Sequence, residues 1–553
     1  MRKSSGGLQD DRMALNTGRN RTYEGLQAAP ALALALFEQS GLRELVDSKF
    51  DIDPRTKLTP GNAMKAMFGP MFSTSGRSPL FTIRNMYRSA PVDLMFGRKV
   101  DFDSLGARAF DRNLDALFGK DLGELSYECY RKLCGFYLLD SSVYNIDMTN
   151  FGVTSLTKLP DIAGAKVPER CGHAKDGHNE RLVYSLLSIT DGNGIVCYER
   201  PYDGSTTDGE MDRDAIEFLS GKADPSESVL IADCKIVTMP LISSMVSKGF
   251  GFVSKCPENF GGKIKSDIVY SVKNGIMGPS SARGGWEVYD TDADVNGTGL
   301  RFVAYRTTED VDAGIGYLRD QGGKEARARF ARFESRTFNC DVDARRALDE
   351  VLCDHTDSAY DASWSIDAIE VSAGYGRRGR PRKGEKPMIK TEYRANVGLE
   401  FNEDRARRLS QDRGVRVLVT NLPRANADAE NIRFGATADT VLLSYLGQYR
   451  IEHAFRLMKD GLGIDRVYLH RPSRENAMMF VISIAAMVWD AVDAVLRDSG
   501  FGKTLATVID ELHPLTVVHD RGRDEEFFEG DDALIGMFLD CAKVLGVDVD
   551  RIF

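Results

Sequence analysis

Apolar residues recur along this chain in two different rhythms, which divide it into helical and strand-rich regions. After a polar tail at residues 1–22, helical periodicity dominates residues 23–135 and predicts a mostly helical N-terminal region. Residues 136–256 instead contain short runs rich in β-branched and aromatic residues, which predict strands with helices between them. The expected strands lie at 138–148, 182–190, 194–201, 228–233 and 251–256, and the expected helices near 210–220 and 236–248. This order predicts an α/β fold with a mixed sheet flanked by helices.

The pattern changes again after residue 256. Residues 257–435 are predicted to form an inserted β-rich domain, and residues 436–497 return to helical periodicity. Within the insertion, strands are expected at 265–273, 286–292, 300–306 and 415–421, and a basic amphipathic helix at 324–336. The apolar run from Ala477 to Trp489 predicts a buried helix. The remaining segment, residues 498–553, is predicted to be a small helical appendage.

The segment from Tyr445 to Lys459, YLGQYRIEHAFRLMK, combines an acidic residue with basic and aromatic neighbours. Wound as one helix of 3.6 residues per turn, it brings six polar side chains to one side, with an apolar stripe next to them. The polar set is Tyr445, Gln448, Tyr449, Glu452, Arg456 and Lys459, and the stripe is Ile451, Phe455, Met458 and Leu462. A carboxylate in that setting suits a metal ligand that works beside phosphates. A solvated face with an i,i+4 pair between Glu452 and Arg456 gives the same pattern.

Two aspartates upstream stand at the ends of strand-like runs. Asp147 lies in SVYNIDM, and Asp233 closes the apolar run from Val229 to Ala232, which is typical of a strand buried on both faces. A carboxylate at the end of a core strand is costly to bury unless a cation or hydrogen bonds compensate it. Each aspartate is therefore either a ligand at the sheet edge or a cap of the following turn or helix.

Taken together, these motifs resemble the DDE transposases of bacterial insertion sequences, in the group with a Y-x2-R-x3-E-x6-K signature. Tyr445, Glu452 and Lys459 fit that spacing, whereas Gln448 occupies the arginine position and Arg450 follows two residues later. The run IDMTNF is similar to the first catalytic strand of the family, and VLIADCK to the second. The resemblance extends from about residue 25 to about residue 495.

The resemblance implies an RNase H-like catalytic core made of residues 136–256 and 436–497, interrupted by the insertion at 257–435. It implies that residues 23–135 bind DNA and support assembly, and that a homodimer acts on paired transposon ends. Asp147, Asp233 and Glu452 would be the catalytic residues and the ligands of two Mg²⁺ or Mn²⁺ ions. The residues expected to contact DNA from the glutamate helix are Tyr445, Gln448, Arg450, Arg456 and Lys459. The implied reactions are cleavage at the transposon ends and strand transfer into target DNA.

The net charge of −10 argues against a nucleic-acid partner if it is taken over the whole chain. The distribution of charge changes this picture, because residues 375–390 hold seven Lys or Arg and one Glu. The core of this loop, Arg378-Gly379-Arg380-Pro381, resembles an AT-hook, so Arg378, Arg380 and Arg382 are candidate DNA-binding residues. A solvated basic loop is the alternative interpretation.

Composition and hydropathy limit the remaining possibilities. No apolar run reaches the ~18 residues of a membrane span, so no membrane partner is expected. Nine cysteines without a C-x-x-C pair favour reduced thiols in a cytoplasm. The resemblance implies that this is a bacterial cytoplasm, with the protein on the nucleoid when it is bound to DNA. Two competing functions stay open: an RNase H-like DNA nuclease without strand transfer, and a non-catalytic protein that binds A·T-rich DNA.

Overall fold

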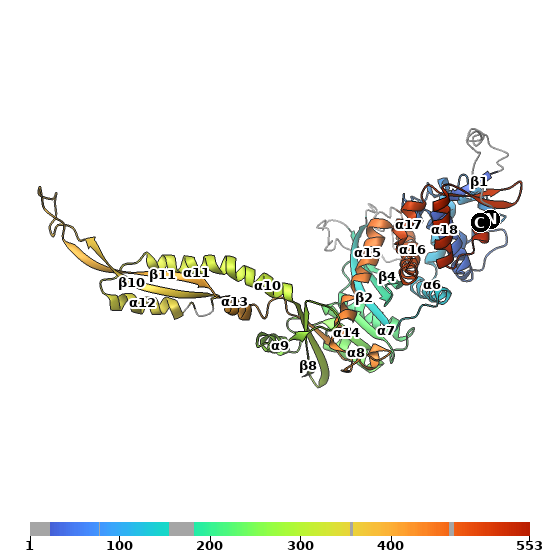
Figure 1. Cartoon of the computed structure of the whole chain (residues 1–553). Helices are drawn as coiled ribbons and strands as arrows, with labels where there is room; N and C mark the ends of the chain where they lie inside the picture. Colours follow the sequence, from blue (N-terminus) through green and yellow to red (C-terminus); the bar gives the residue numbers. More distant parts are fainter. Residues whose placement is uncertain are drawn as a thin grey trace. The chain divides into compact units, whose positions relative to one another are not determined.

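The computed structural model describes residues 23–76, 78–153, 182–353, 355, 358–463, 469 and 471–553. The predicted tail at 1–22 lies outside the described residues. The chain divides into two compact units, shown in Figure 1. The first consists of Met1–Ser254 with Ser444–Phe553, and the second of Lys255–Leu443.

The N-terminal part of the first unit is helical, as predicted, apart from one short strand at its start. Its elements are β1 (Tyr23–Gln27), α1 (Ala28–Gln39), α2 (Leu42–Asp47), α3 (Pro60–Phe68), α4 (Val92–Phe96), α5 (Ala107–Phe118) and α6 (Leu122–Tyr137). Local sequence sets several of these boundaries. The Thr59 hydroxyl accepts the Asn62 N–H at the start of α3, where Pro60 occupies the first turn, and Asp121 caps α6 in the same way.

The C-terminal segment differs from its predicted all-helical character. Its elements are α16 (Pro472–Asp498), α17 (Leu505–Leu512), β13 (Thr516–Asp520), β14 (Glu525–Glu529) and α18 (Asp532–Val544). The two strands form a three-stranded antiparallel sheet with β1, in which Tyr23 pairs with Asp520. Figure 1 shows these blue and red elements side by side. The pairing of β1 with β13 spans almost the whole chain and leaves no local signal, and the hairpin strands β13 and β14 have only five residues each, so the helical prediction failed here.

A mixed sheet forms the centre of the first unit and confirms the predicted mixed α/β class. Its strands are β2 (Val143–Val153), β3 (Leu182–Asp191), β4 (Val196–Asp203), β5 (Val229–Ala232) and β6 (Gly251–Lys255). They lie in the order β4-β3-β2-β5-β6. The β2–β3 and β3–β4 pairs are antiparallel, and the β2–β5 and β5–β6 pairs are parallel.

Helices cover both faces of this sheet. On β4, the ring of Tyr198 stacks on Phe218 of α7 (Asp208–Ser220) with ring centroids 3.9 Å apart. The next residue, Glu199, accepts hydrogen bonds from Ser188 on β3 and from Ser483 of α16. Because neighbouring side chains of a strand point to opposite faces, α7 and α16 lie on opposite sides of the sheet. A further helix, α8 (Met239–Lys248), connects β5 to β6.

The long helix α16 is the predicted buried apolar helix. By length and composition alone it could cross a membrane, with a mean hydropathy of 1.9 over its most apolar window, but 83% of that window is buried inside the protein. It packs against α5, α6 and β4. These contacts are those of a core helix that fills the space between the sheet and the N-terminal helices.

The second unit contains two separate strand assemblies. Its first sheet is antiparallel and has the order β12-β9-β8-β7, and its second is the β10–β11 ribbon. The strands are β7 (Gly278–Pro279), β8 (Trp286–Val295), β9 (Thr298–Thr307), β10 (Tyr360–Ser372), β11 (Ile389–Phe401) and β12 (Arg416–Thr420). The helices are α9 (Ile264–Lys273), α10 (Thr308–Tyr317), α11 (Gly323–Glu334), α12 (Asp341–Cys353), α13 (Glu403–Leu409) and α14 (Ala438–Leu446), the last of which ends in the first unit.

Helices α11 and α12 run along the β10–β11 ribbon (Figure 1). Phe330 and Phe333 of α11 and Leu348 of α12 bury against Ala395 and Val397 of β11. This small core holds the ribbon on one side. The basic loop at 375–390 closes the far end of the ribbon, between β10 and β11.

Candidate functional site

Asp147 and Asp233 occupy neighbouring positions on two adjacent parallel strands, at the point where the pairing of β2 with β5 ends. Asp233 directly follows β5, whereas Asp147 lies inside β2, because the strand predicted at 138–148 runs from Val143 to Val153 instead. The β2–β5 register pairs Ile146 with Ala232, so the following residue on each strand is the aspartate. The backbone of Asp233 stays extended, with φ −69° and ψ 170°, and continues the strand direction. Its side chain makes no capping hydrogen bond to the turn that follows, and it is exposed. The capping interpretation therefore does not describe Asp233.

Asp147 points toward the face of the sheet that α16 covers. It pairs with Ser188 of β3, which pairs in turn with Glu199 of β4, and opposite residues in a sheet share a face. Glu199 accepts a hydrogen bond from α16, which identifies that face. The Asp147 carboxylate is half-buried and accepts the Met148 backbone N–H at 2.7 Å. This carboxylate keeps access to solvent, so the cost of full burial does not arise.

A further carboxylate near this pair was not identified from the sequence. Asp212 of α7 is 2% exposed, and its Oδ2 atom has no hydrogen-bond partner among the described residues. Burial, followed by the nearby charges of Asp208, Asp147 and Asp233, raises the pKa of Asp212 to about 7. Asp147 and Asp233 therefore lie close enough for their charges to act on Asp212. This edge of the sheet concentrates negative charge, which favours a bound cation.

The segment that carries Glu452 is not one continuous helix, contrary to the prediction. Helix α14 ends at Leu446, and α15 (Tyr449–Arg456) begins after a turn at Gly447 and Gln448. A glycine within a helix costs about 1 kcal/mol relative to alanine, which accounts for a break at this position. Tyr445 therefore belongs to a different helix from Glu452, and Gln448 is the N-terminal flanking residue of α15.

Helix α15 continues into a π-helical turn, η8 (Leu457–Gly461), which holds Lys459. The predicted apolar stripe is buried throughout, at Ile451, Phe455, Met458 and Leu462. The opposite side of α15 is open, because Glu452, His453 and Arg456 are all exposed. The wider π-helical turn rotates the side chains that follow Arg456 relative to a regular helix, and such turns are frequent at functional sites.

Two side chains attach this segment to the central sheet. The Lys459 ammonium donates to the Thr149 hydroxyl at 2.6 Å, and the Arg450 guanidinium donates to the Gly192 carbonyl. Thr149 lies two residues beyond Asp147 and so shares its face of the sheet. Helix α15 packs against β2 and β3. Glu452 therefore lies on a helix that packs over β2, on the same face of the sheet as Asp147.

The contacts of Arg450 indicate a structural role for this side chain. Its side chain packs over Gly194, whose φ of +92° lies in the region that favours glycine, and it binds the turn between β3 and β4. Arg450 therefore fixes α15 to the sheet. Tyr449, in contrast, is 63% exposed beside it.

The three predicted ligands do not form one ligand set as they are placed. Among the described residues, no group of three or more His, Cys, Asp or Glu side chains comes close enough together to hold a metal ion. The structure brings the strand positions of Asp147 and Asp233 together and sets Glu452 on the adjoining helix with a free path to solvent. The joint ligand set stays a prediction.

The predicted basic loop is exposed at the end of the β10–β11 ribbon. Arg378, Arg380 and Arg382 all point their side chains to solvent. Arg377 pairs with Glu385 at 2.9 Å, and the same carboxylate accepts the Arg382 backbone N–H at 2.7 Å. Glu385 thereby folds the loop on itself and leaves the other arginines outward. Gly379, at φ +123°, permits the turn between Arg378 and Arg380.

Two comparisons with known proteins gave matches, and one gave none. A family profile described as a domain of unknown function (DUF4277) matches residues 30–129. Comparison with curated proteins gave no match. Among solved structures, the chain is similar to the cryo-EM structure of a piggyBac transposase synaptic complex with hairpin DNA. The two are 11% identical, with a TM-score of 0.37, and the match covers 91% of this chain and 81% of that chain. What this chain does is therefore inferred from its own residues.

Proposed function

We propose that this chain is a DDE transposase with an RNase H-like core, which cleaves the ends of its own element and transfers them into target DNA. The observation that carries the proposal is the register that places Asp147 beside Asp233 where the parallel pairing of β2 with β5 ends, with the Glu452 helix over the face of β2 that bears Asp147. The strand order β4-β3-β2-β5-β6, with antiparallel pairs on one side and parallel pairs on the other, supports the RNase H-like core.

The side chains present at this edge suit a divalent cation. Asp147, Asp233 and Glu452 would supply oxygen ligands of the kind that Mg²⁺ and Mn²⁺ prefer. The Asp212 oxygen that lacks a partner among the described residues, and the raised pKa of that carboxyl group, indicate an excess of negative charge beside them, which Lys235, paired with Asp208, offsets only in part. When bound, two such ions would activate the attacking hydroxyl and neutralise the charge that develops on the phosphate.

The surrounding residues would position the DNA. Arg456 is exposed one turn after Glu452 and is free to contact a phosphate, and Tyr445 and Gln448 lie at the junction before α15. Lys459 would act through Thr149, by holding the glutamate segment against β2. The basic loop with Arg378, Arg380 and Arg382 would add a second DNA contact. A homodimer would hold the two ends of the element.

An assay for joint molecules tests this function directly. Purified protein would be incubated with Mg²⁺, a labelled donor plasmid that carries the coding region with its native flanking DNA, and an unlabelled target plasmid. Strand transfer predicts labelled joint molecules that survive deproteinisation. A nicked donor without joint molecules would favour a nuclease of the same fold. Binding without any cleavage would favour a non-catalytic DNA-binding protein, and either result would contradict the transposase assignment.

The Lys459–Thr149 hydrogen bond is expected to matter for turnover. Replacing Lys459 by Met removes the donor, lets the glutamate segment shift on β2, and should lower the strand-transfer rate up to about 100-fold. Thr149→Val removes the acceptor and should give a similar loss. If the contact is the cause, the double variant will be no slower than Lys459→Met alone. Losses that multiply in the double variant would show that the two residues act independently.

A further inference from the structure

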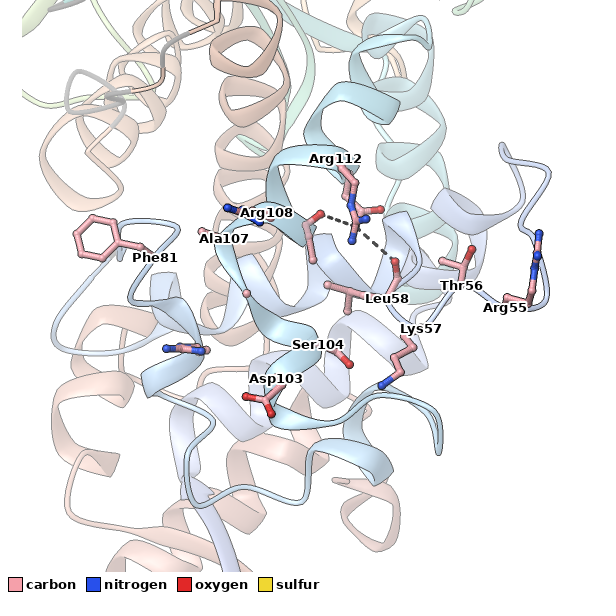
Figure 2. A pocket seen from close by; sticks show the side chains of 14 residues that line it. Arg55, Thr56, Lys57, Leu58, Phe81, Asp103, Ser104, Ala107, Arg108 and Arg112 are labelled. Carbon is pink, nitrogen blue, oxygen red and sulfur yellow. Dashed lines mark hydrogen bonds between the residues drawn. The ribbon is translucent and has the colours of Figure 1, made fainter.

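The N-terminal helical region contains an open pocket of about 870 Å³, shown in Figure 2. It lies between the loop at 55–58, the turn η3 (Ile83–Asn85) and the first half of α5. Its walls carry one carboxylate, Asp103. They also carry five cationic side chains, which are Arg55, Lys57, Arg84, Arg108 and Arg112. The chain as a whole has a net charge of −10. A local excess of positive charge on an acidic protein favours an anionic ligand at this place.

Two of these cations are already paired, and three are not. Arg55 contacts Asp53 at 2.6 Å, and Lys57 contacts Asp101 at 2.8 Å. In the part of the chain that the structure describes, no carboxylate forms an ion pair with the other three, which are Arg84, Arg108 and Arg112. All three are exposed. Their charges are available to a ligand.

The sequence of α5 explains why its two arginines stay unpaired. Its nearest acidic residues, Asp111 and Asp115, are held by Arg474 of α16 at 2.9 and 2.6 Å. Arg108 and Arg112 are four residues apart and so share one side of the helix. The first turn of α5 also lines the pocket, and Gly106 before it has no side chain to cap the free N–H groups. The positive end of the helix dipole adds to the charge of the arginines.

The pocket is formed without a ligand. The Asn113 side chain donates to the Leu58 carbonyl at 3.4 Å and to the Ala109 carbonyl at 2.9 Å, which ties the 55–58 loop to α5 (Figure 2). At the rim, Phe81 is 70% exposed (Figure 2). An exposed aromatic ring beside free arginines suits a polyanion with apolar sugar or base surfaces more than it suits a small inorganic anion.

We propose that this pocket binds the phosphate backbone of DNA through Arg84, Arg108 and Arg112. It would form a DNA contact separate from the carboxylate site, within the region of unknown function that spans residues 30–129. The identity of the polyanion rests on the proposed function. The pocket is open to solvent and its three arginines come from two elements, Arg84 from η3 and the other two from α5, so they can contact successive phosphates of a backbone.

Binding to duplex DNA at several salt concentrations tests the proposal. The full chain would be titrated into a fluorescent 40-base-pair duplex in EDTA, so that no cleavage occurs. Replacing Arg84, Arg108 and Arg112 by Ala is expected to weaken binding at least about tenfold and to reduce the salt slope by roughly two to three. The matched control replaces Arg98, Lys120 and Arg131 by Ala, which removes the same charge from exposed positions outside the pocket. It should leave the slope unchanged.

A variant with Lys at all three pocket positions keeps the charge and should restore the slope, which separates loss of charge from loss of folding. Equal slopes for the pocket and control variants would overturn the proposal and leave the joint-molecule assay unaffected. Calorimetry with inorganic phosphate covers the remaining alternative. Tight phosphate binding that is lost in the pocket variant, with an unchanged DNA slope, would identify a small-anion site and would also overturn the proposal.

Discussion

Replacing Asp147 by Asn is expected to abolish donor cleavage and strand transfer, with a loss of at least about 10³-fold. The amide keeps the shape of the side chain and its acceptor for the Met148 N–H, but it removes the negative charge that a divalent ion requires. The same prediction holds for Asp233→Asn, since Asp147 and Asp233 directly follow the paired residues Ile146 and Ala232. Glu452→Gln should lose activity to a similar extent. The rates of cleavage and joining with Mg²⁺ are the measurement.

Binding separates this effect from damage to the fold. Affinity for the donor DNA in EDTA should stay within about twofold of the unmodified protein, because a metal ligand contributes little without metal. The matched control is Asp140→Asn, an exposed aspartate just before β2. It should keep full activity. Cleavage by Asp147→Asn at an unchanged rate would remove Asp147 from the site.

Replacing Glu199 by Gln should make the protein more stable at alkaline pH and leave its stability in acid nearly unchanged. Glu199 is buried beneath α16, and burial raises its pKa from 4.5 to about 8. A raised carboxyl pKa contributes stability that is fully present below the unfolded value of 4.5 and is lost as pH rises through the folded value. The buried carboxylate therefore destabilises the protein above pH 8.

The full shift corresponds to roughly 5 kcal/mol, and relaxation around the charge should reduce the observed gain of Glu199→Gln to about 2–3 kcal/mol at pH 9. Gln can still bond to Ser188 and Ser483, so the comparison changes only the charge. Urea unfolding of both proteins between pH 5 and 9 measures the gain. Glu217→Gln, at an exposed position, should show no pH-dependent difference. A gain for Glu199→Gln of the same size at every pH would contradict the account.

The parts of the fold that the sequence predicted are those with a strong local pattern. The run from Val229 to Ala232 is fully buried and forms β5, and the apolar stripe after Ile451 is buried as expected. The position of Asp233 could be inferred because it closes a recognisable strand, and Asp147 was correctly placed on a strand. The predicted end of that strand was wrong, because β2 continues to Val153, and only the register with β5 shows that the two aspartates are neighbours.

The errors came from segments where composition and spacing disagree. Residues 265–273 are rich in β-formers and were expected to form a strand, but they lie in α9. Ile268 and Val272 are buried and four residues apart, while Tyr270 between them is 69% exposed, which is a helical period. Strand β10 was missed for the opposite reason, because its Asp, Ser and Ala residues are poor strand formers. Its spacing does mark a strand, since Tyr360, Ala362, Trp364 and Ile366 alternate with polar residues.

In the candidate site, too, local spacing predicted some residues, and only the fold shows the others. Spacing identified Glu452 and Lys459, but it could not show that Gly447 breaks the helix or that Lys459 bonds to Thr149. Asp212 carried a weak signal, four residues after Asp208 in a predicted helix. Only the fold shows that it is buried beside Asp147 and Asp233. The pocket at Arg84 and Arg108 gathers residues that are distant in sequence, so no local motif announces it.

A crystal of the protein bound to duplex DNA and soaked in Mn²⁺ tests the central claim most directly. The account predicts anomalous-scattering peaks beside Asp147 of β2 and Asp233 after β5, with carboxylate oxygens of Asp147, Asp233 and Glu452 each about 2 Å from an ion. That result requires the exposed Glu452 side chain to turn toward the aspartate pair. Manganese bound elsewhere, or a Glu452 carboxylate that remains apart from a metal held by the two aspartates, would contradict the account.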